Sequence, residues 1–219
     1  MTVLQTRDDD MRRMLNDVET YWRDLSRARR LPMRSQVDPA AIDQAMPQTF
    51  IMQRVAPGVA RIRVSGQWVN DMLGLDGRGM PLCSLMQPAS RAEFARLLDA
   101  VFTWPAVVEV PLVSSGGFLQ AKLSARLLML PLLDDHGVAN RAIGVFATAT
   151  PDRVKARRFG LGDGALRCDR ISPAPRPRLI VQQKDATLRQ IMQAGSNGTE
   201  KGPHAVRRPA LELVVDNVR

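Results

Sequence analysis

The alternation of apolar and polar residues predicts a chain that opens with a helix and continues as two groups of strands separated by helices. Near the N-terminus, apolar residues recur at helical spacing and form one stripe: Met11, Met14, Leu15, Val18, Tyr21, Trp22 and Leu25. Asp8 to Asp10 lie near the expected start and arginines 27, 29 and 30 near the expected end, which suits the helix dipole. Leu31-Pro32 is expected to end this helix.

Shorter elements follow. Asp38 can cap a short helix that begins at Pro39. Residues 50–55 indicate a buried strand, and after a turn at Pro57-Gly58 the alternation of residues 60–65 predicts its hairpin partner, with Ala60, Ile62 and Val64 facing inward. Ser90 and Glu93 form a capping-box pattern and predict a helix over 90–103.

Three further strands are predicted over 107–113, 119–129 and 141–150. In the middle one, the odd positions are apolar and the even positions are polar as far as Arg126, which indicates a half-buried strand. Two strands, then helices, then three strands predict an α+β fold: one five-stranded antiparallel sheet with helices on one face.

The pattern fails after residue 150, where prolines alternate with charged and small residues. We therefore expect three parts: an N-terminal amphipathic helix (1–35), a folded domain (36–150) and a mostly irregular, flexible C-terminal tail (151–219).

Charge separates the tail from the domain. Of the net charge of +9, residues 35–150 contribute nothing, with 9 Lys or Arg against 9 Asp or Glu, whereas residues 151–219 carry 14 against 7. Phosphate contacts with nucleic acid are therefore an option for the tail alone. The tail holds one aromatic residue, Phe159, so base stacking has little support, and a solvated basic linker is the simpler interpretation.

The remaining composition points to the cytoplasm. Cys83 and Cys168 are far apart in sequence, as expected of free thiols in a reducing compartment. No apolar run approaches the roughly 20 residues of a membrane span. The N-terminus shows no export signal.

Several short motifs together resemble a PAS-domain subfamily found mainly in alphaproteobacteria, whose stand-alone members have an N-terminal Tyr-Trp helix. The motifs are Tyr21-Trp22-Arg23, Arg30-Leu31-Pro32, Asp38-Pro39, Gly79-Met80-Pro81-Leu82, Leu130-Pro131-Leu132 and Arg141-Ala142-Ile143-Gly144. The resemblance spans residues 11–150. It implies a PAS-like five-stranded sheet that cups a small pocket against helices, in a sensory or protein-interaction domain.

Residues that could carry chemistry are few. His136 lies in an expected turn and His204 in the tail, neither spaced as a base beside a nucleophile, so we expect no enzyme. Asp134, Asp135 and His136 are adjacent, which is typical of an acidic turn rather than a metal site.

PAS domains can hold haem or flavin, but two features argue against either group here. The helix over 90–103 has no His for haem. Cys83 lacks the Asn and Arg neighbours of the photosensory flavin motif. We expect no cofactor, and leave open a small apolar ligand or a core filled by side chains.

The sequence thus predicts a non-catalytic PAS-type sensory and protein-interaction module in bacterial signalling or regulation, with a protein partner. Tyr21, Trp22 and Leu25 are the candidate partner or dimer contacts, because the N-terminal helix can cover its own sheet or pair with the same helix of a second subunit. The alternative is a regulator that contacts nucleic acid through the basic tail.

Overall fold

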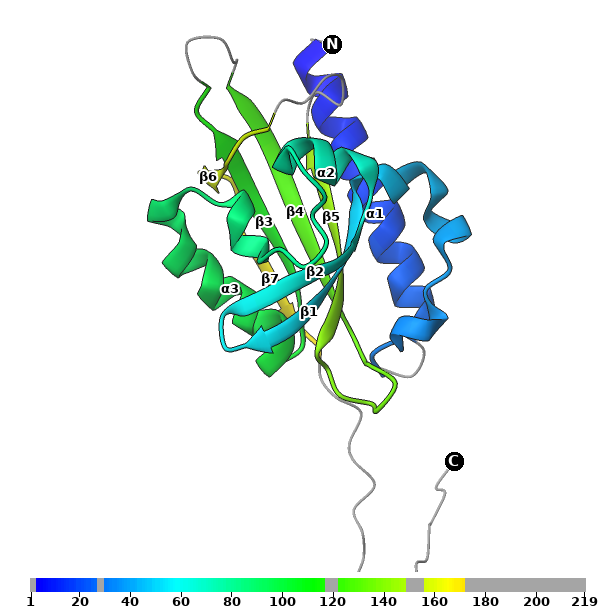
Figure 1. Cartoon of the computed structure of the whole chain (residues 1–219). Coiled ribbons are helices and arrows are strands. Elements are labelled where there is room, and N and C mark those ends of the chain that lie inside the picture. The colour runs from blue at the N-terminus through cyan, green and yellow to red at the C-terminus, as the bar shows by residue number, and fades with distance from the viewer. Residues whose placement is uncertain (1–2, 27–29, 117–121, 149–155, 172–219) are drawn as a thin grey trace, which may run out of the picture. The chain divides into compact units, whose positions relative to one another are not determined.

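The computed structural model describes residues 3–26, 30–116, 122–148 and 156–171 (Figure 1). Most of the predicted tail, residues 172–219, lies outside the described residues. The helices are α1 (Val3–Leu25), η2 (Arg34–Gln36), η3 (Pro39–Gln48), α2 (Gln67–Leu73), η4 (Leu82–Leu85), η5 (Pro88–Ser90) and α3 (Arg91–Thr103), where η marks a 3₁₀ helix. The strands are β1 (Thr49–Ala56), β2 (Val59–Ser65), β3 (Ala106–Ser114), β4 (Leu123–Leu132), β5 (Arg141–Thr148), β6 (Gly160–Leu161) and β7 (Arg167–Arg170).

The strands form one antiparallel sheet in the order β2-β1-β5-β4-β3, with β6 and β7 both paired to the far side of β3. The five-stranded antiparallel sheet predicted from the sequence is confirmed. The hairpin of β1 and β2 lies beside β5, so the first and last strands of this five-stranded set are neighbours.

The inner face of the sheet is covered by α2, η4 and α3, which agrees with the layer of helices predicted from the order of strands and helices. Side chains from these helices and the sheet form one continuous apolar cluster, the inner core. Phe50 of β1 packs directly over Gly144 of β5, where an added Cβ would lie 2.2 Å from the ring. Gly144 therefore leaves the room in which this aromatic ring fits.

The outer face of the sheet is buried as well, by α1 and η3 (Figure 1). The predicted layer of helices lies on the inner face, and the N-terminal helix, whose position the sequence left open, lies with η3 on the outer face. In β4, Leu127 and Met129 belong to the inner core while Leu128 and Leu130 belong to the outer core. Because both faces of this strand are apolar beyond Arg126, each needs its own helical layer.

Two predictions for the N-terminal half of the chain were wrong: the start of α1 and the direction in which Val64 of β2 faces. α1 starts at Val3, so Asp8 and Asp10 lie inside it and pair with Arg12 and Arg13, at 2.9 and 3.1 Å, instead of sitting at its start. Val64, expected to face the core, is 52% exposed, because a register shift between β1 and β2 reverses the alternation there.

Of the two predicted N-terminal helix caps, one is confirmed and the other is not. Asp38 caps η3 by accepting a hydrogen bond from the Ala40 amide at 2.9 Å, as expected. Ser90 does not cap α3 through its side chain; its hydroxyl instead accepts a hydrogen bond from the amide of Leu161 in β6, at 3.4 Å. A contact with a distant strand thus replaces the local one.

Residues 156–171, expected to be part of the irregular tail, belong to the fold. We call them the C-terminal strap. They contribute β6 and β7 to the sheet, and Phe159 is fully buried. The sequence does not predict these strands because β6 has two residues, and β7, Arg167–Arg170, is polar and attaches through its backbone.

Phe159→Ala is expected to destabilise the protein by about 3–5 kcal/mol, because it removes a fully buried aromatic ring and leaves a cavity. Urea denaturation of the full-length protein checks this. Leu166→Ala in the same strap is the control and should change stability by no more than about 0.5 kcal/mol, since Leu166 is exposed. Equal effects of the two substitutions would contradict the burial of Phe159.

Candidate functional site at the edge of the sheet

The inner core is filled by large apolar side chains at the place where a PAS-type pocket is expected. These side chains are at most 1% exposed: Phe50, Met52, Met72, Leu82, Met86, Phe94, Phe146 and Phe159. The buried polar residues in the described part of the chain are Glu19, Thr49 and Ser114. Glu19 lies on α1, and the Thr49 hydroxyl donates to the Ala45 carbonyl.

The usual ligand of a haem is a His, and His136 lies on the exposed β4–β5 turn, away from the inner core. A flavin ring is held by polar partners along its edge, and the inner core presents mainly apolar side chains. The absence of a cofactor stays a prediction. Cys83 is partly buried against the inner core, which suits the small core residue expected from the sequence.

The strap enters the inner core at Phe159. The Phe159 amide donates to the Leu85 carbonyl at 2.8 Å, and the Gln87 amide donates to the Phe159 carbonyl at 2.7 Å. Its ring meets Phe146 of β5 edge-on, with 4.9 Å between the ring centroids. The strap is thereby fixed to the segment that leads into α3.

From Phe159 the strap runs along the outer edge of β3. β6 pairs with Leu112 and Val113, and β7 pairs with residues 106–109. The amide of Ile171 adds a hydrogen bond to the Pro105 carbonyl at 2.8 Å. The edge of β3 is therefore occupied by the protein's own backbone along much of its length.

The strap also contacts α1, through a network of ion pairs around Arg167 of β7. Arg167 binds Glu19 of α1 with both terminal nitrogens, and its Nη2 lies 3.3 Å from Glu109 of β3. Glu19 also accepts from Arg23 at 2.6 Å, and Glu109 pairs with Arg126 of β4 at 2.7 Å. Since Arg167 lies opposite Glu109 in the β3–β7 register, the pairing of these strands points its side chain toward α1.

Glu19 is the centre of this network and is only 7% exposed. Burial by itself would raise the pKa of Glu19, but hydrogen bonds from Arg167 and Arg23, together with their charges, lower it below its ordinary value. The pKa of Arg167 is raised, chiefly by its hydrogen bond to Glu19. The carboxylate and the guanidinium therefore stabilise each other's charged forms.

The predicted contact residues Tyr21, Trp22 and Leu25 lie near the end of α1, and Tyr21 and Trp22 form hydrogen bonds with other parts of the same chain. Trp22 is 2% exposed, and its indole Nε1 donates to the Pro131 carbonyl of β4 at 3.0 Å. The Tyr21 hydroxyl accepts from the Asp38 amide at 2.7 Å, and Leu25 is half-buried. α1 thus covers its own sheet and Trp22 is buried there, while partner or dimer contacts through Tyr21, Trp22 and Leu25 stay a prediction.

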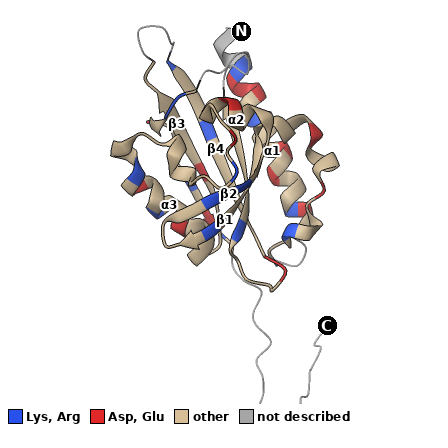
Figure 2. Ribbon diagram, viewed as in Figure 1, with Lys and Arg blue, Asp and Glu red and all other residues tan. Residues whose placement is uncertain are grey.

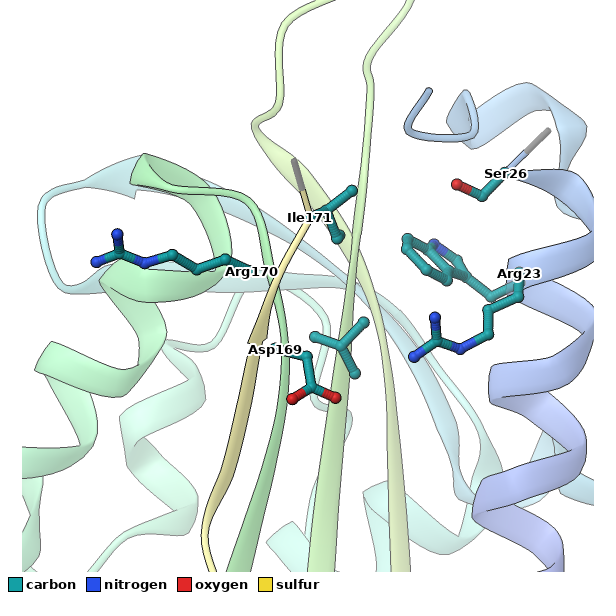
Figure 3. Close-up of a pocket in the computed structure, with 7 residues that line it drawn as sticks. Arg23, Ser26, Asp169, Arg170 and Ile171 are labelled. Atoms are coloured by element: carbon teal, nitrogen blue, oxygen red, sulfur yellow. The ribbon is translucent and has the colours of Figure 1, made fainter. Parts of the chain in front are cut away.

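A shallow groove of about 410 Å³ lies between this end of α1 and β7. In Figure 3, Arg23 and Asp169 point into it from the two sides, whereas Arg170 points away. Arg170 lies over the ring of Trp104, 5.7 Å from its centroid, on the other side of β7. The groove thus marks the junction of α1 with the strap.

The other candidate residues have structural roles. The Asp134 carboxylate accepts from the amides of His136 and Val138, both at 2.9 Å, and from the Asn140 side chain at 2.6 Å, so it is used to shape the β4–β5 turn. Within the described ranges, no group of three or more His, Cys, Asp or Glu side chains is arranged to hold a metal ion. Among the described helices, none is both long and apolar enough to cross a membrane.

The strand order and the helices packed on the sheet define a PAS-type fold. Residues 11–147 match the PAS-domain family, and the chain belongs to that family. The match ends before the strap, so Phe159 and Arg167 lie outside it. The alphaproteobacterial origin and the Tyr-Trp helix as a subfamily mark stay predictions.

Solved structures similar to this chain include two described by their light-oxygen-voltage (LOV) domains. The light-state structure of the blue-light photoreceptor Aureochrome1 LOV is 15% identical, with 51% of this chain and 88% of that chain covered and a TM-score of 0.37. A LOV domain studied with a flavin analogue is 18% identical, with 52% and 84% covered and a TM-score of 0.36. No curated protein matches the sequence.

Sequence reasoning missed Glu19 and Arg167. Glu19 lies four residues after Leu15 and three before Trp22, so an acid stands on the apolar stripe of the helix. That position is a signal, because a carboxylate on a buried face requires a cationic partner. The sequence does not reveal which of the many arginines provides it.

Replacing Glu19 and Arg167, singly and together, should yield a coupling energy of about 1–3 kcal/mol. Glu19→Gln keeps the side-chain volume and removes the charge, whereas Arg167→Gln removes the charge and shortens the side chain. Urea denaturation of the four proteins gives the coupling. The matched cycle of Glu19 with Arg23, a pair one helical turn apart, should give a smaller value of about 0.3–0.5 kcal/mol. Additive effects for Glu19 and Arg167 would show that the contact between these two side chains contributes nothing to stability.

Acid should abolish the contribution of Glu19. Because its pKa is lowered in the folded protein, the stabilisation is present above the pKa of the unfolded chain and is lost as the pH falls through the folded value. The stability difference between wild type and Glu19→Gln should therefore be constant near neutral pH and shrink below about pH 4.3. Denaturation midpoints across this range measure it; a difference that persists in acid would contradict the assignment.

Proposed function

We propose that this protein is a non-catalytic sensory and protein-interaction module of the PAS family, acting in regulation in the bacterial cytoplasm. Its family membership supports the class of function. The free thiols of Cys83 and Cys168 are consistent with a reducing compartment. The observation that carries the proposal is that one segment, the strap, contacts both the inner core and the helix on the opposite face of the sheet.

The signal acts on the inner core. Three methionines, Met52, Met72 and Met86, are fully buried there, and their unbranched side chains can repack around a small apolar ligand or a shifted α3. Such repacking would change the position of Phe159, because its backbone is hydrogen-bonded to Leu85 and Gln87, which lie in the segment that precedes α3. The strap would then shift along β3.

The response appears on α1. In one state Arg167 holds Glu19 and α1 is fixed to the sheet; in the other state the strap is displaced and Glu19 loses a partner it needs while buried. A signal that favours the second state increases the population in which α1 is loosened. A protein partner reads this change.

Amide hydrogen exchange tests the proposal. In Arg167→Gln, residues 11–25 of α1 should exchange several-fold faster than in wild type, while α2 stays protected. Phe159→Leu, a milder change in the inner core, should also speed exchange in α1, because the strap joins the two sites.

The matched control is Arg63→Gln. Arg63 is an exposed arginine of β2 that donates to Gln53 at 2.8 Å and touches neither α1 nor the strap through a hydrogen bond. It should leave α1 exchange unchanged. If Phe159→Leu loosens only α2 and α3 while α1 exchange is unchanged, the strap does not couple the two faces. A turnover activity that requires an inner-core residue would overturn the non-catalytic assignment.

Nucleic-acid binding through the basic residues is the second candidate, favoured by the excess of charge after residue 150. Two of these basic residues already have partners within the chain, which weakens this candidate. Arg167 pairs with the carboxylates of Glu19 and Glu109, and Arg170 lies over the ring of Trp104. In a gel shift, we expect weak binding that disappears at physiological salt. A chain shortened after Ala174 is the proper comparison, because shortening after residue 150 would also remove Phe159. Tight, salt-resistant binding that is lost on shortening after Ala174 would favour the second candidate.

A further inference from the structure

A second and larger groove lies on the outer side of α1, away from the strap. It runs between α1 and η3, has a volume of about 610 Å³, and is lined by residues 10–18 of α1 and 40–45 of η3. Val18, Ile42 and Ala45 border it but are buried in the outer core, so its accessible apolar surface is that of the half-buried Met14 and the exposed Ala40 and Ala41. On the η3 side, the groove is lined in part by two residues with small side chains, Ala40 and Ala41.

The rim of this groove is acidic. Asp10, Asp17 and Asp43 lie along it, and acidic residues recur on α1 and η3 (Figure 2). Arg13, the one cation among the lining residues, is already paired with Asp10 at 3.1 Å. No ion pair joins Asp17 or Asp43 to another residue in the part of the chain that the structure describes. Accessible apolar atoms of Met14, Ala40 and Ala41 beside two carboxylates without an ion pair favour a ligand that is cationic and partly apolar.

We propose that this groove docks a cationic amphipathic helix of a partner protein. Apolar side chains of such a helix would cover Met14 and the alanines, and its Lys or Arg residues would pair with Asp17 and Asp43. A helix is favoured over a strand because a strand needs a free sheet edge. β3 is paired with the strap. At the edge of β2, the Ile62 amide donates to the Met80 carbonyl, and the Ile62 carbonyl accepts from the Gly79 amide.

A twofold dimer in which this groove meets its own copy is disfavoured. In a twofold contact the same surface meets itself, so Asp17 and Asp43 would face other aspartates, and like charges would oppose association. The occupant must therefore carry the opposite charge. The inference specifies a partner for the proposed interaction module, but it concerns a surface separate from the Glu19–Arg167 network.

The experiment is a selection of displayed peptides, about four helical turns long, on the full-length protein. The variant Asp17→Lys/Asp43→Lys serves for counter-selection, because both residues are exposed and their replacement leaves the core intact. The matched control, Asp24→Lys/Asp135→Lys, reverses one exposed aspartate on α1 and one elsewhere and has the same net charge. Fluorescence anisotropy then measures the affinity of each selected peptide.

We expect selected peptides with apolar residues at helical spacing flanked by Lys or Arg. Their affinity should fall about tenfold or more in Asp17→Lys/Asp43→Lys, weaken as salt rises, and be unchanged in the control. The proposal is overturned if the selected peptides are acidic, lack helical spacing, or bind both variants equally, or if none distinguishes wild type from the groove variant. Light scattering that shows a dimer lost only in the groove variant would assign the surface to a second copy instead.

The two proposals can fail separately. Arg167→Gln should keep peptide binding, because Arg167 does not line this groove. Peptide binding without a change in α1 exchange in the strap variants would support the docking surface and contradict the coupling. The converse result would support the coupling and overturn the docking surface.

Discussion

The outer face of the central sheet is apolar, and the need to keep it from water determines how α1 and the strap are arranged. Leu128, Leu130 and Leu132 of β4 lie on this face and are fully buried. α1 supplies the cover, and a helix of this length gains its stability from such packing more than from its own propensity. The indole Nε1 of Trp22 donates a hydrogen bond to the Pro131 carbonyl of β4, and this bond fixes the position of the helix on the sheet.

When α1 packs on the outer face of the sheet, the carboxylate of Glu19 is buried as well. Glu19 lies among the apolar residues of α1, and a buried carboxylate is tolerated only beside cations. Arg23 on the same helix is one partner, but the second arrives on β7, a strand that extends the sheet past β3. The strap is therefore more than an edge cover, because it completes the electrostatic environment of a helix on the other side of the molecule's main sheet.

The elements with strong local patterns were predictable, as in the stripe of α1, the β1–β2 hairpin and the alternation at the start of β4. The strap was not, because β7 is polar and its strand character comes from pairing with Glu109 and its neighbours. Phe159 stood out as an isolated aromatic residue, but nothing nearby in sequence indicates that Phe146 receives it. Likewise Glu19 was visible as an acid on an apolar stripe, whereas its partner is 148 residues away.

That separation has a consequence for how the chain is made. Domains fold during synthesis as their segments leave the ribosome, and α1 emerges first. Its carboxylate cannot meet Arg167 until nearly all of the described chain has been released, and joining such distant segments is slow. Among the described elements the earliest helix is therefore completed last, since α1 covers the apolar outer face without the bond between Glu19 and Arg167 until the strap has been synthesised.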